Sequence, residues 1–180
     1  MTCKGMRIVV LTAYAVLLPP GLAADEAKPK RKDSRLPQPA HAKLTPSATP
    51  GELKAGQAFT YQIKARLDPG WKIFPYSPVQ PENAPVFTTF DFFDTGGLKV
   101  SDDWRASKAA AKELSPVFDG ASVEFFEKEV TWSVRIIVPK GTNAGERTLK
   151  CQACYQLLSD TAVTAPGRWT LPDVTIRISP

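Results

Sequence analysis

The chain has 180 residues, enough for one domain and additional segments, and its 17 prolines argue against a helical bundle. Its formal charge is +5, but residues 51–180 carry fifteen Lys and Arg against fifteen Asp and Glu, so the excess lies before them. A nucleic-acid-binding domain would carry a basic face on its folded part, so no nucleic-acid partner is expected.

Residues 1–23 are typical of a signal peptide. Lys4 and Arg7 precede the apolar run "IVVLTAYAVLL", and cleavage after Ala23 would place small residues at the expected positions. The alternative is a membrane anchor, but the run is shorter than the ~20 apolar residues of a spanning helix. We expect export, to the periplasm or otherwise out of the cell, with no membrane span after signal removal.

Residues 24–50 are polar, basic and proline-rich, with too few apolar side chains to offset the entropy of ordering. They predict a disordered linker before a single folded domain over 51–180. The segment "KPKRK" is interpreted as a solvated spacer, or alternatively as an electrostatic contact with an anionic envelope surface. His41, the only histidine, falls in this linker, which argues against a catalytic histidine or a histidine metal site.

The remaining sequence favours short strands. Residues 58–67 alternate apolar and polar side chains, which is the two-residue period of a half-buried strand, and "DPG" after them predicts a turn. Residues 102–113 contain the best helix formers but no apolar stripe, so a short helix or an ordered loop is expected there. The pattern predicts an all-β, antiparallel sandwich. Its other expected strands cover 71–74, 85–93, 98–100, 122–130, 130–138, 147–155 and 169–178.

The strand expected over 147–155 contains two cysteines. Alternation places Cys151 on the core face and Cys154 on the solvent face. Residues three apart in a strand are separated by roughly 10 Å, whereas a disulfide needs Cα atoms within about 7 Å. A disulfide between Cys151 and Cys154 therefore requires this strand to turn or break, and the sequence leaves open whether it forms.

Other uses of "CQAC" find little support. A thioredoxin-type CxxC lies at a helix start, and no helical pattern surrounds this one. A c-type haem site needs histidine at position 155, which is tyrosine, and a structural zinc site needs four ligands where the domain offers two thiols. No metal or cofactor is expected. Because exposed thiols in exported proteins oxidise or cross-link, Cys154 is expected to have a use.

Residues 51–180 resemble a known family. "RTLKCQACYQLLSDTAVTAPGRWTLPDVTI" is similar to the last strands of the N-terminal periplasmic domain of the thiol:disulfide interchange protein DsbD, where a "YQxC" strand leads to a short loop with a second cysteine. "DPGWKIFPYSP" and "SPVFDGASVEFFEKEVTWSVRIIVP" resemble earlier segments of that domain, in the same order.

The resemblance implies an immunoglobulin-like sandwich that passes reducing equivalents between a DsbD-type membrane protein and periplasmic thiol oxidoreductases. It implies that Cys154 is the first family cysteine, and that Phe118, with Val117 beside it, is the aromatic cap over the site. The second family cysteine would fall near Val163, so it is missing, and Cys151 takes the place of a tyrosine. The exchange activity of a protein-disulfide reductase would then be impaired, because no second thiol resolves the mixed disulfide.

Three readings remain open. In the first, Cys154 exchanges thiols and Cys151 either resolves the mixed disulfide or only packs. In the second, the domain is a redox-inactive, protein-binding module of the cell envelope. In the third, Trp71, Tyr76 and Trp104 form an aromatic platform for a carbohydrate. The sequence does not indicate the partner, the oligomeric state or the electron donor.

Overall fold

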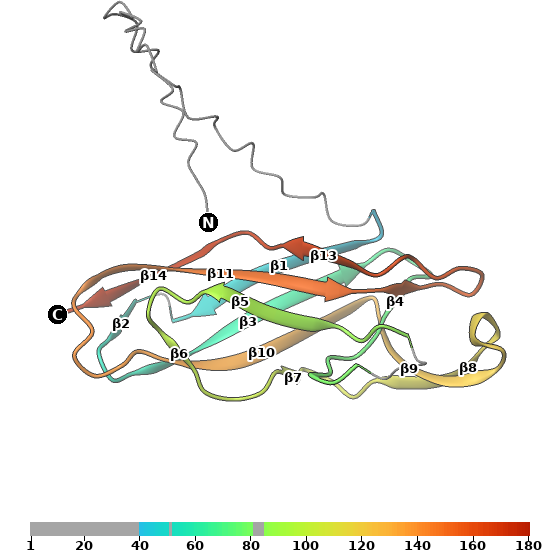
Figure 1. Ribbon diagram of the computed structural model, residues 1–180, viewed down its shortest axis with the longest axis horizontal. Helices are drawn as coiled ribbons and strands as arrows, with labels where there is room; N and C mark the ends of the chain where they lie inside the picture. The colour runs from blue at the N-terminus through green and yellow to red at the C-terminus, as the bar shows by residue number, and fades with distance from the viewer. Residues whose placement is uncertain (1–39, 51, 81–84) are drawn as a thin grey trace, which may run out of the picture. The chain divides into compact units, whose positions relative to one another are not determined.

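The computed structural model describes residues 40–50, 52–80 and 85–180, which form an immunoglobulin-like β-sandwich without an α-helix (Figure 1). The predicted signal peptide and residues 24–39 of the predicted linker lie outside the described residues. The first sheet has the order β1-β3-β10-β6, with β7 also paired to β10. Its strands are β1 (Ala42–Thr49), β3 (Ala58–Leu67), β6 (Lys99–Val100), β7 (Arg105–Ala106) and β10 (Glu129–Ile137).

The second sheet faces the first across the main core. Its order is β13-β11-β14-β2, and β5 pairs with β11. All of its pairs are antiparallel except the one between β14 and β2. Its strands are β2 (Glu52–Lys54), β5 (Thr89–Asp94), β11 (Gly145–Tyr155), β13 (Gly167–Thr170) and β14 (Val174–Ser179).

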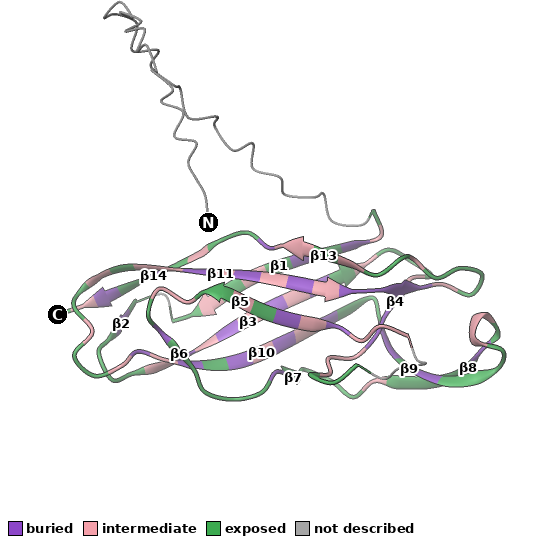
Figure 2. Cartoon of the chain, viewed as in Figure 1, coloured by how far each residue is buried: buried purple, intermediate pink, exposed green. Residues whose placement is uncertain are grey.

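The main core is built from the alternating faces of the long strands. Tyr61 and Ile63 on β3, Trp132 on β10 and Leu149 on β11 are all fully buried, while their chain neighbours are partly exposed. Buried and less buried positions alternate along the long strands (Figure 2). The predicted strand 58–67 and its inward face are therefore confirmed. Burial of aromatic and aliphatic side chains of this size, at about 1.5–3 kcal/mol each, is the main source of stability.

A third sheet lies at the end of the sandwich away from the C-terminus, with the order β12-β4-β9-β8 (Figure 1). The backbone continues into it from the second sheet, through β11 and β12, and leaves it for the first sheet, through β9 and β10. Its strands are β4 (Lys72–Ile73), β8 (Ala111–Ser115), β9 (Ala121–Glu127) and β12 (Leu157–Leu158), with the 3-10 helix η1 (Pro116–Phe118) between β8 and β9.

Three pairs of adjacent apolar residues in this end sheet are buried, one pair at each of β4, β9 and β12. In each pair, one residue packs into the main core and the other into a second hydrophobic cluster, and Phe74 of the first pair directly follows β4. The main core receives Ile73, Phe126 and Leu157, and the second cluster receives Phe74, Phe125 and Leu158. We call β4, β9 and β12 the end wall, because these strands separate the two clusters.

One expectation is wrong, and one of two alternatives is ruled out. The predicted linker does not extend to residue 50, because residues 42–49 form β1, which pairs with β3 along its whole length. Its apolar residues are few, but Ala42 and Leu44 alternate and are buried, so pairing with β3 and packing supply the stabilisation that composition alone does not indicate. Residues 102–113 contain no helix. They form β7, a connection and most of β8, because backbone pairing with β10 and β9 overrides local helix propensity.

Within the residues that the structure describes, no helix has the length and apolar character needed to cross a membrane.

Candidate functional site

Both candidate cysteines lie on β11, and this strand remains extended through them. Cys151 is fully buried in the main core, whereas Cys154 is partly exposed on the opposite face, and both thiols are free. β11 has an irregularity between Lys150 and Cys151, but it does not change the direction of either side chain. The strand therefore keeps the two sulfurs apart, as the alternation predicted.

The surroundings of Cys151 suppress its reactivity. Burial, and to a smaller extent the nearby Asp91 carboxylate, raises the pKa of Cys151 to about 12. The thiol donates a hydrogen bond to the Gln152 carbonyl oxygen at 3.6 Å. The Tyr61 hydroxyl lies close enough to influence this pKa, but it has no hydrogen-bond partner among the residues that the structure describes. Because the thiolate is the reactive form, burial and the raised pKa disfavour nucleophilic attack by Cys151.

Cys154 lies on the outward face of the second sheet, on β11, which runs between β5 and β13. Its direct neighbours across the strands are Arg168 on β13 and Thr89 on β5. Directly opposed side chains in antiparallel sheets have Cβ atoms about 4.5–5.5 Å apart, so Thr89 and Arg168 flank Cys154 on the same face of the sheet.

Residues 156–166 leave the second sheet at the end of β11 and return to it at the start of β13. We call this segment the excursion. The Gln156 side chain accepts a hydrogen bond from the Val86 amide at 2.9 Å and donates one to the Thr164 carbonyl at 2.8 Å. Val163, where the resemblance places a second cysteine, forms an isolated bridge with Leu158 and is 37% exposed. No thiol of the described residues occupies this excursion.

Val117 and Phe118 lie in η1, at the tip of the β8–β9 hairpin. The Phe118 ring packs edge-on against Phe74, with 6.1 Å between ring centroids. Both residues pack against the second cluster, whose buried members are Phe74, Val123, Phe125 and Leu158 and include neither cysteine. Their role as a cap over Cys154 stays a prediction.

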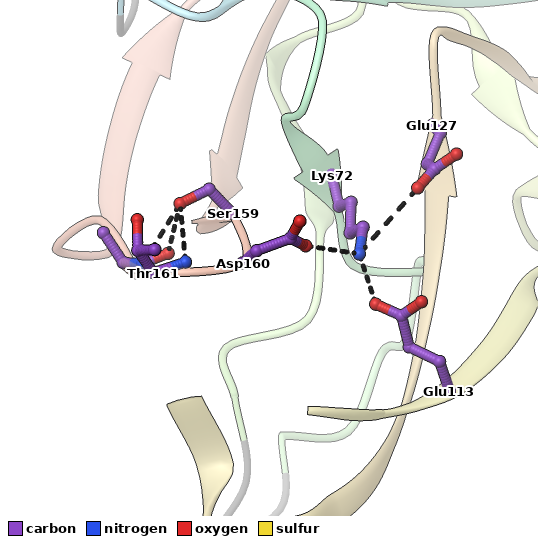
Figure 3. A network of polar contacts seen from close by, with 7 residues as sticks. Lys72, Glu113, Glu127, Ser159, Asp160 and Thr161 are labelled. Atoms are coloured by element: carbon purple, nitrogen blue, oxygen red, sulfur yellow. Dashed lines mark hydrogen bonds and ion pairs between the residues drawn. The ribbon is translucent and has the colours of Figure 1, made fainter. Parts of the chain in front are cut away.

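A buried lysine, Lys72, joins carboxylates from three segments at the end of the sandwich that carries the third sheet. It was not predicted from the sequence. The Lys72 side chain is 8% exposed, and its ammonium lies 4.6 Å from the centre of the Phe125 ring. It donates hydrogen bonds to Glu113 on β8 and to Asp160, the latter at 3.1 Å, and lies 3.8 Å from Glu127 on β9 (Figure 3). We call Lys72 and these three carboxylates the Lys72 hub.

Charge balance accounts for the burial of Lys72. Desolvation lowers the pKa of Lys72, but the hydrogen bonds and charges of Glu113 and Asp160 outweigh it, so the pKa is raised overall and the ammonium stays charged. An unpaired buried ammonium would be strongly unfavourable. The signal in the sequence was the single charge inside the apolar run "WKIF", because a charge there must find partners.

The aromatic platform is not assembled. Trp104 is buried in the main core, and Tyr76 stacks on Phe90 with 6.0 Å between ring centroids. Trp71 is half-buried, and His41 stacks flat on it at 4.1 Å while its Nδ1 lies 3.2 Å from Asp68. His41 is thus part of the fold, not of a linker. The described residues contain no group of three metal-ligating side chains suited to an ion.

No protein-family model and no curated protein matches the chain. Among solved structures, the N-terminal periplasmic domain of ScsB from Proteus mirabilis superposes with a TM-score of 0.50 and 17% identity, over 77% of this chain and 49% of that one. The chain thus spans about half the length of the ScsB structure. This likeness is one of fold, and it agrees with the predicted immunoglobulin-like sandwich.

Two surface proteins give weaker matches. The major pilin subunit BcpA of Bacillus cereus has a TM-score of 0.39 and 9% identity, over 76% of this chain and 39% of that one. The N-terminal domain of a Streptococcus gordonii adhesin has a TM-score of 0.39 and 12% identity, over 82% of this chain and 33% of that one.

Proposed function

We propose that this protein is an exported immunoglobulin-like domain that takes part in thiol–disulfide exchange through Cys154 alone. The observation that carries the proposal is the opposite placement of the two thiols on one extended strand, Cys154 at the surface and Cys151 in the core. The resemblance of residues 147–176 to the DsbD domain, and the likeness in fold to a periplasmic domain, support it.

The chemistry has two exchange steps. The Cys154 thiolate attacks a disulfide of the partner, so that one sulfur of the partner bonds to Cys154 and the other leaves as a thiolate. A second thiol, supplied by a protein partner, then attacks this mixed disulfide and releases Cys154 as a thiolate. Cys151 takes no part, since it is buried and its thiol stays protonated. The partners are a periplasmic thiol oxidoreductase or a DsbD-type membrane protein.

The test is to trap the mixed disulfide. The mature protein is first treated with an aromatic disulfide, which activates its accessible thiols. It is then mixed with a reduced thioredoxin-fold oxidoreductase whose resolving cysteine is replaced by serine. We expect a covalent complex with the unaltered protein and with Cys151→Ser, and none with Cys154→Ser. A complex that depends on Cys151, or a reversible loss of two thiols on oxidation, would contradict exchange through Cys154 alone.

A redox-inactive protein-binding module is the second candidate. It is favoured by Val163, because the position of the missing cysteine holds an aliphatic residue without a thiol, and the backbone there pairs with Leu158. The two candidates differ in one measurement. In a redox-inactive module, Cys154→Ser would bind the partner with unchanged affinity. Neither this variant nor the unaltered protein would form a covalent complex with the oxidoreductase.

A further inference from the structure

The end of the sandwich has a small hydrophobic cluster of its own. The second cluster contains four buried side chains, Phe74, Val123, Phe125 and Leu158, and the end wall separates it from the main core. Parts of a protein that share few buried contacts with the rest open locally at a lower free energy than the whole. This end can therefore lose its packing while the main core keeps its own.

Two segments at this end are weakly attached. In the described part of the chain, β8 pairs only with β9, and its residues 111–114 are exposed, with Leu114 at 72% (Figure 2). The turn 159–162 is closed mainly by bonds within itself, from the Ser159 amide to the Ala162 carbonyl at 2.8 Å and between the Ser159 hydroxyl and the Ala162 amide at 3.1 Å. Neither β8 nor this turn contributes a buried apolar side chain to either hydrophobic cluster.

Both segments reach the same cation. Glu113 extends from β8 and Asp160 from the turn, and the two carboxylates meet at the Lys72 ammonium (Figure 3). The two acids are 47 residues apart in the sequence (160 − 113), so the hub joins distant parts of the chain. An ammonium has three donors, and here it faces three carboxylates.

We propose that Lys72 couples the β8–β9 hairpin to the turn 159–162, so that the two segments open and close together. Without the ammonium, three carboxylates would face one another and repel, which favours separation of the segments that carry them. The coupling does not depend on thiol chemistry. It would, however, have an effect beyond the hairpin. A partner that binds the hairpin tip would also shift the opening of the excursion between Cys154 and Arg168.

Hydrogen exchange of backbone amides tests the coupling. Lys72→Met keeps an apolar stem over Phe125 and removes the charge. We expect exchange to become about tenfold faster, equivalent to about 1.4 kcal/mol of opening free energy, in both 111–125 and 157–164. Exchange in β3 and β10 should stay unchanged. The matched control is Lys112→Met, because Lys112 lies on the same hairpin but pairs at the surface, 3.8 Å from Glu124; it should leave 157–164 unchanged.

Faster exchange in only one of the two segments, or in neither, would overturn the proposal. If Lys72→Met instead unfolded as a whole, amides in β3 and β10 would also exchange faster. The coupling would then be tested by amide exchange in the unaltered protein. There, the slowest amides of the two segments should report one common opening equilibrium, within about twofold. Two clearly different values would refute a shared opening. Both readouts are independent of mixed-disulfide trapping, so failure here and failure of the proposed exchange activity are distinguishable.

Discussion

The two cysteines of β11 differ in burial, and the difference predicts their reactivity. Cys151 has a pKa of about 12, so at pH 8 roughly one thiol in ten thousand is ionised. Native Cys154→Ser, which retains only this thiol in the domain, should therefore resist iodoacetamide until it is unfolded. Native Cys151→Ser should be labelled under the same conditions, as mass spectrometry would report. Labelling of Cys151 at the same rate as Cys154 would contradict the burial.

Gly167 is a second residue whose local environment leads to a prediction. A Cβ at this position would lie 2.4 Å from the Cη2 and Cζ2 atoms of the Trp169 ring, which itself packs on Tyr155. Gly167→Ala must displace the indole, so we expect a loss of about 1–3 kcal/mol in the free energy of unfolding, measured with urea.

The control for Gly167→Ala is the same change in a Trp169→Leu background. The smaller side chain lacks the ring atoms that the new methyl group would meet, so the additional loss should fall below about 0.5 kcal/mol. An equal loss in both backgrounds would indicate that the backbone of β13, and not the indole, excludes a side chain.

At the scale of elements, β1 extends the domain into a stretch whose composition favours a linker. Leu44 is 2% exposed in the main core, so Leu44→Ala should lower the free energy of unfolding by about 2–5 kcal/mol. The adjacent Lys43 is exposed, and Lys43→Ala should change it by no more than about 0.5 kcal/mol. Denaturant unfolding of the two variants checks this, and equal small effects would return residues 42–49 to the linker.

The regular alternation of the long strands could be read from the sequence. It correctly assigned the inward face of β3 and the opposite directions of Cys151 and Cys154. The end wall could not be assigned in this way, because its pairs of adjacent buried residues, such as Phe125 and Phe126, interrupt the two-residue period. The hub was missed because Lys72, Glu113 and Asp160 are distant in the sequence, and only the fold brings them together.

At the scale of the whole molecule, the buried titratable groups predict sensitivity to alkali. Burial raises the pKa of the Tyr155 hydroxyl, and it raises the pKa of the Cys151 thiol to about 12. Groups whose folded pKa is raised contribute stability below their unfolded pKa values, near 9 for this thiol and 10 for the phenol, and that stability is lost above them. The free energy of unfolding should therefore fall between pH 9 and 11, in contrast to a plateau at lower pH.

Tyr155→Phe isolates one part of this effect. At pH 7 it should not lower the free energy of unfolding, because the buried hydroxyl has no hydrogen-bond partner among the described residues. Above pH 10, the decline should be shallower than in the unaltered protein by up to about 1.4 kcal/mol per pH unit. Denaturant unfolding over this pH range measures both. Parallel curves for the two proteins would rule out ionisation of Tyr155 as a cause.

The end wall has a consequence for how this protein tolerates damage. Phe125 and Phe126 are neighbours in the chain, yet they pack on opposite faces of β9, in separate clusters. Water that enters beside Phe125 when β8 and the hairpin tip loosen would still meet the end wall, where Phe126 packs against Trp132, before it reached the main core. The molecule can thus vary the surface at one end, in evolution or on binding, while the interior that sustains the rest stays dry.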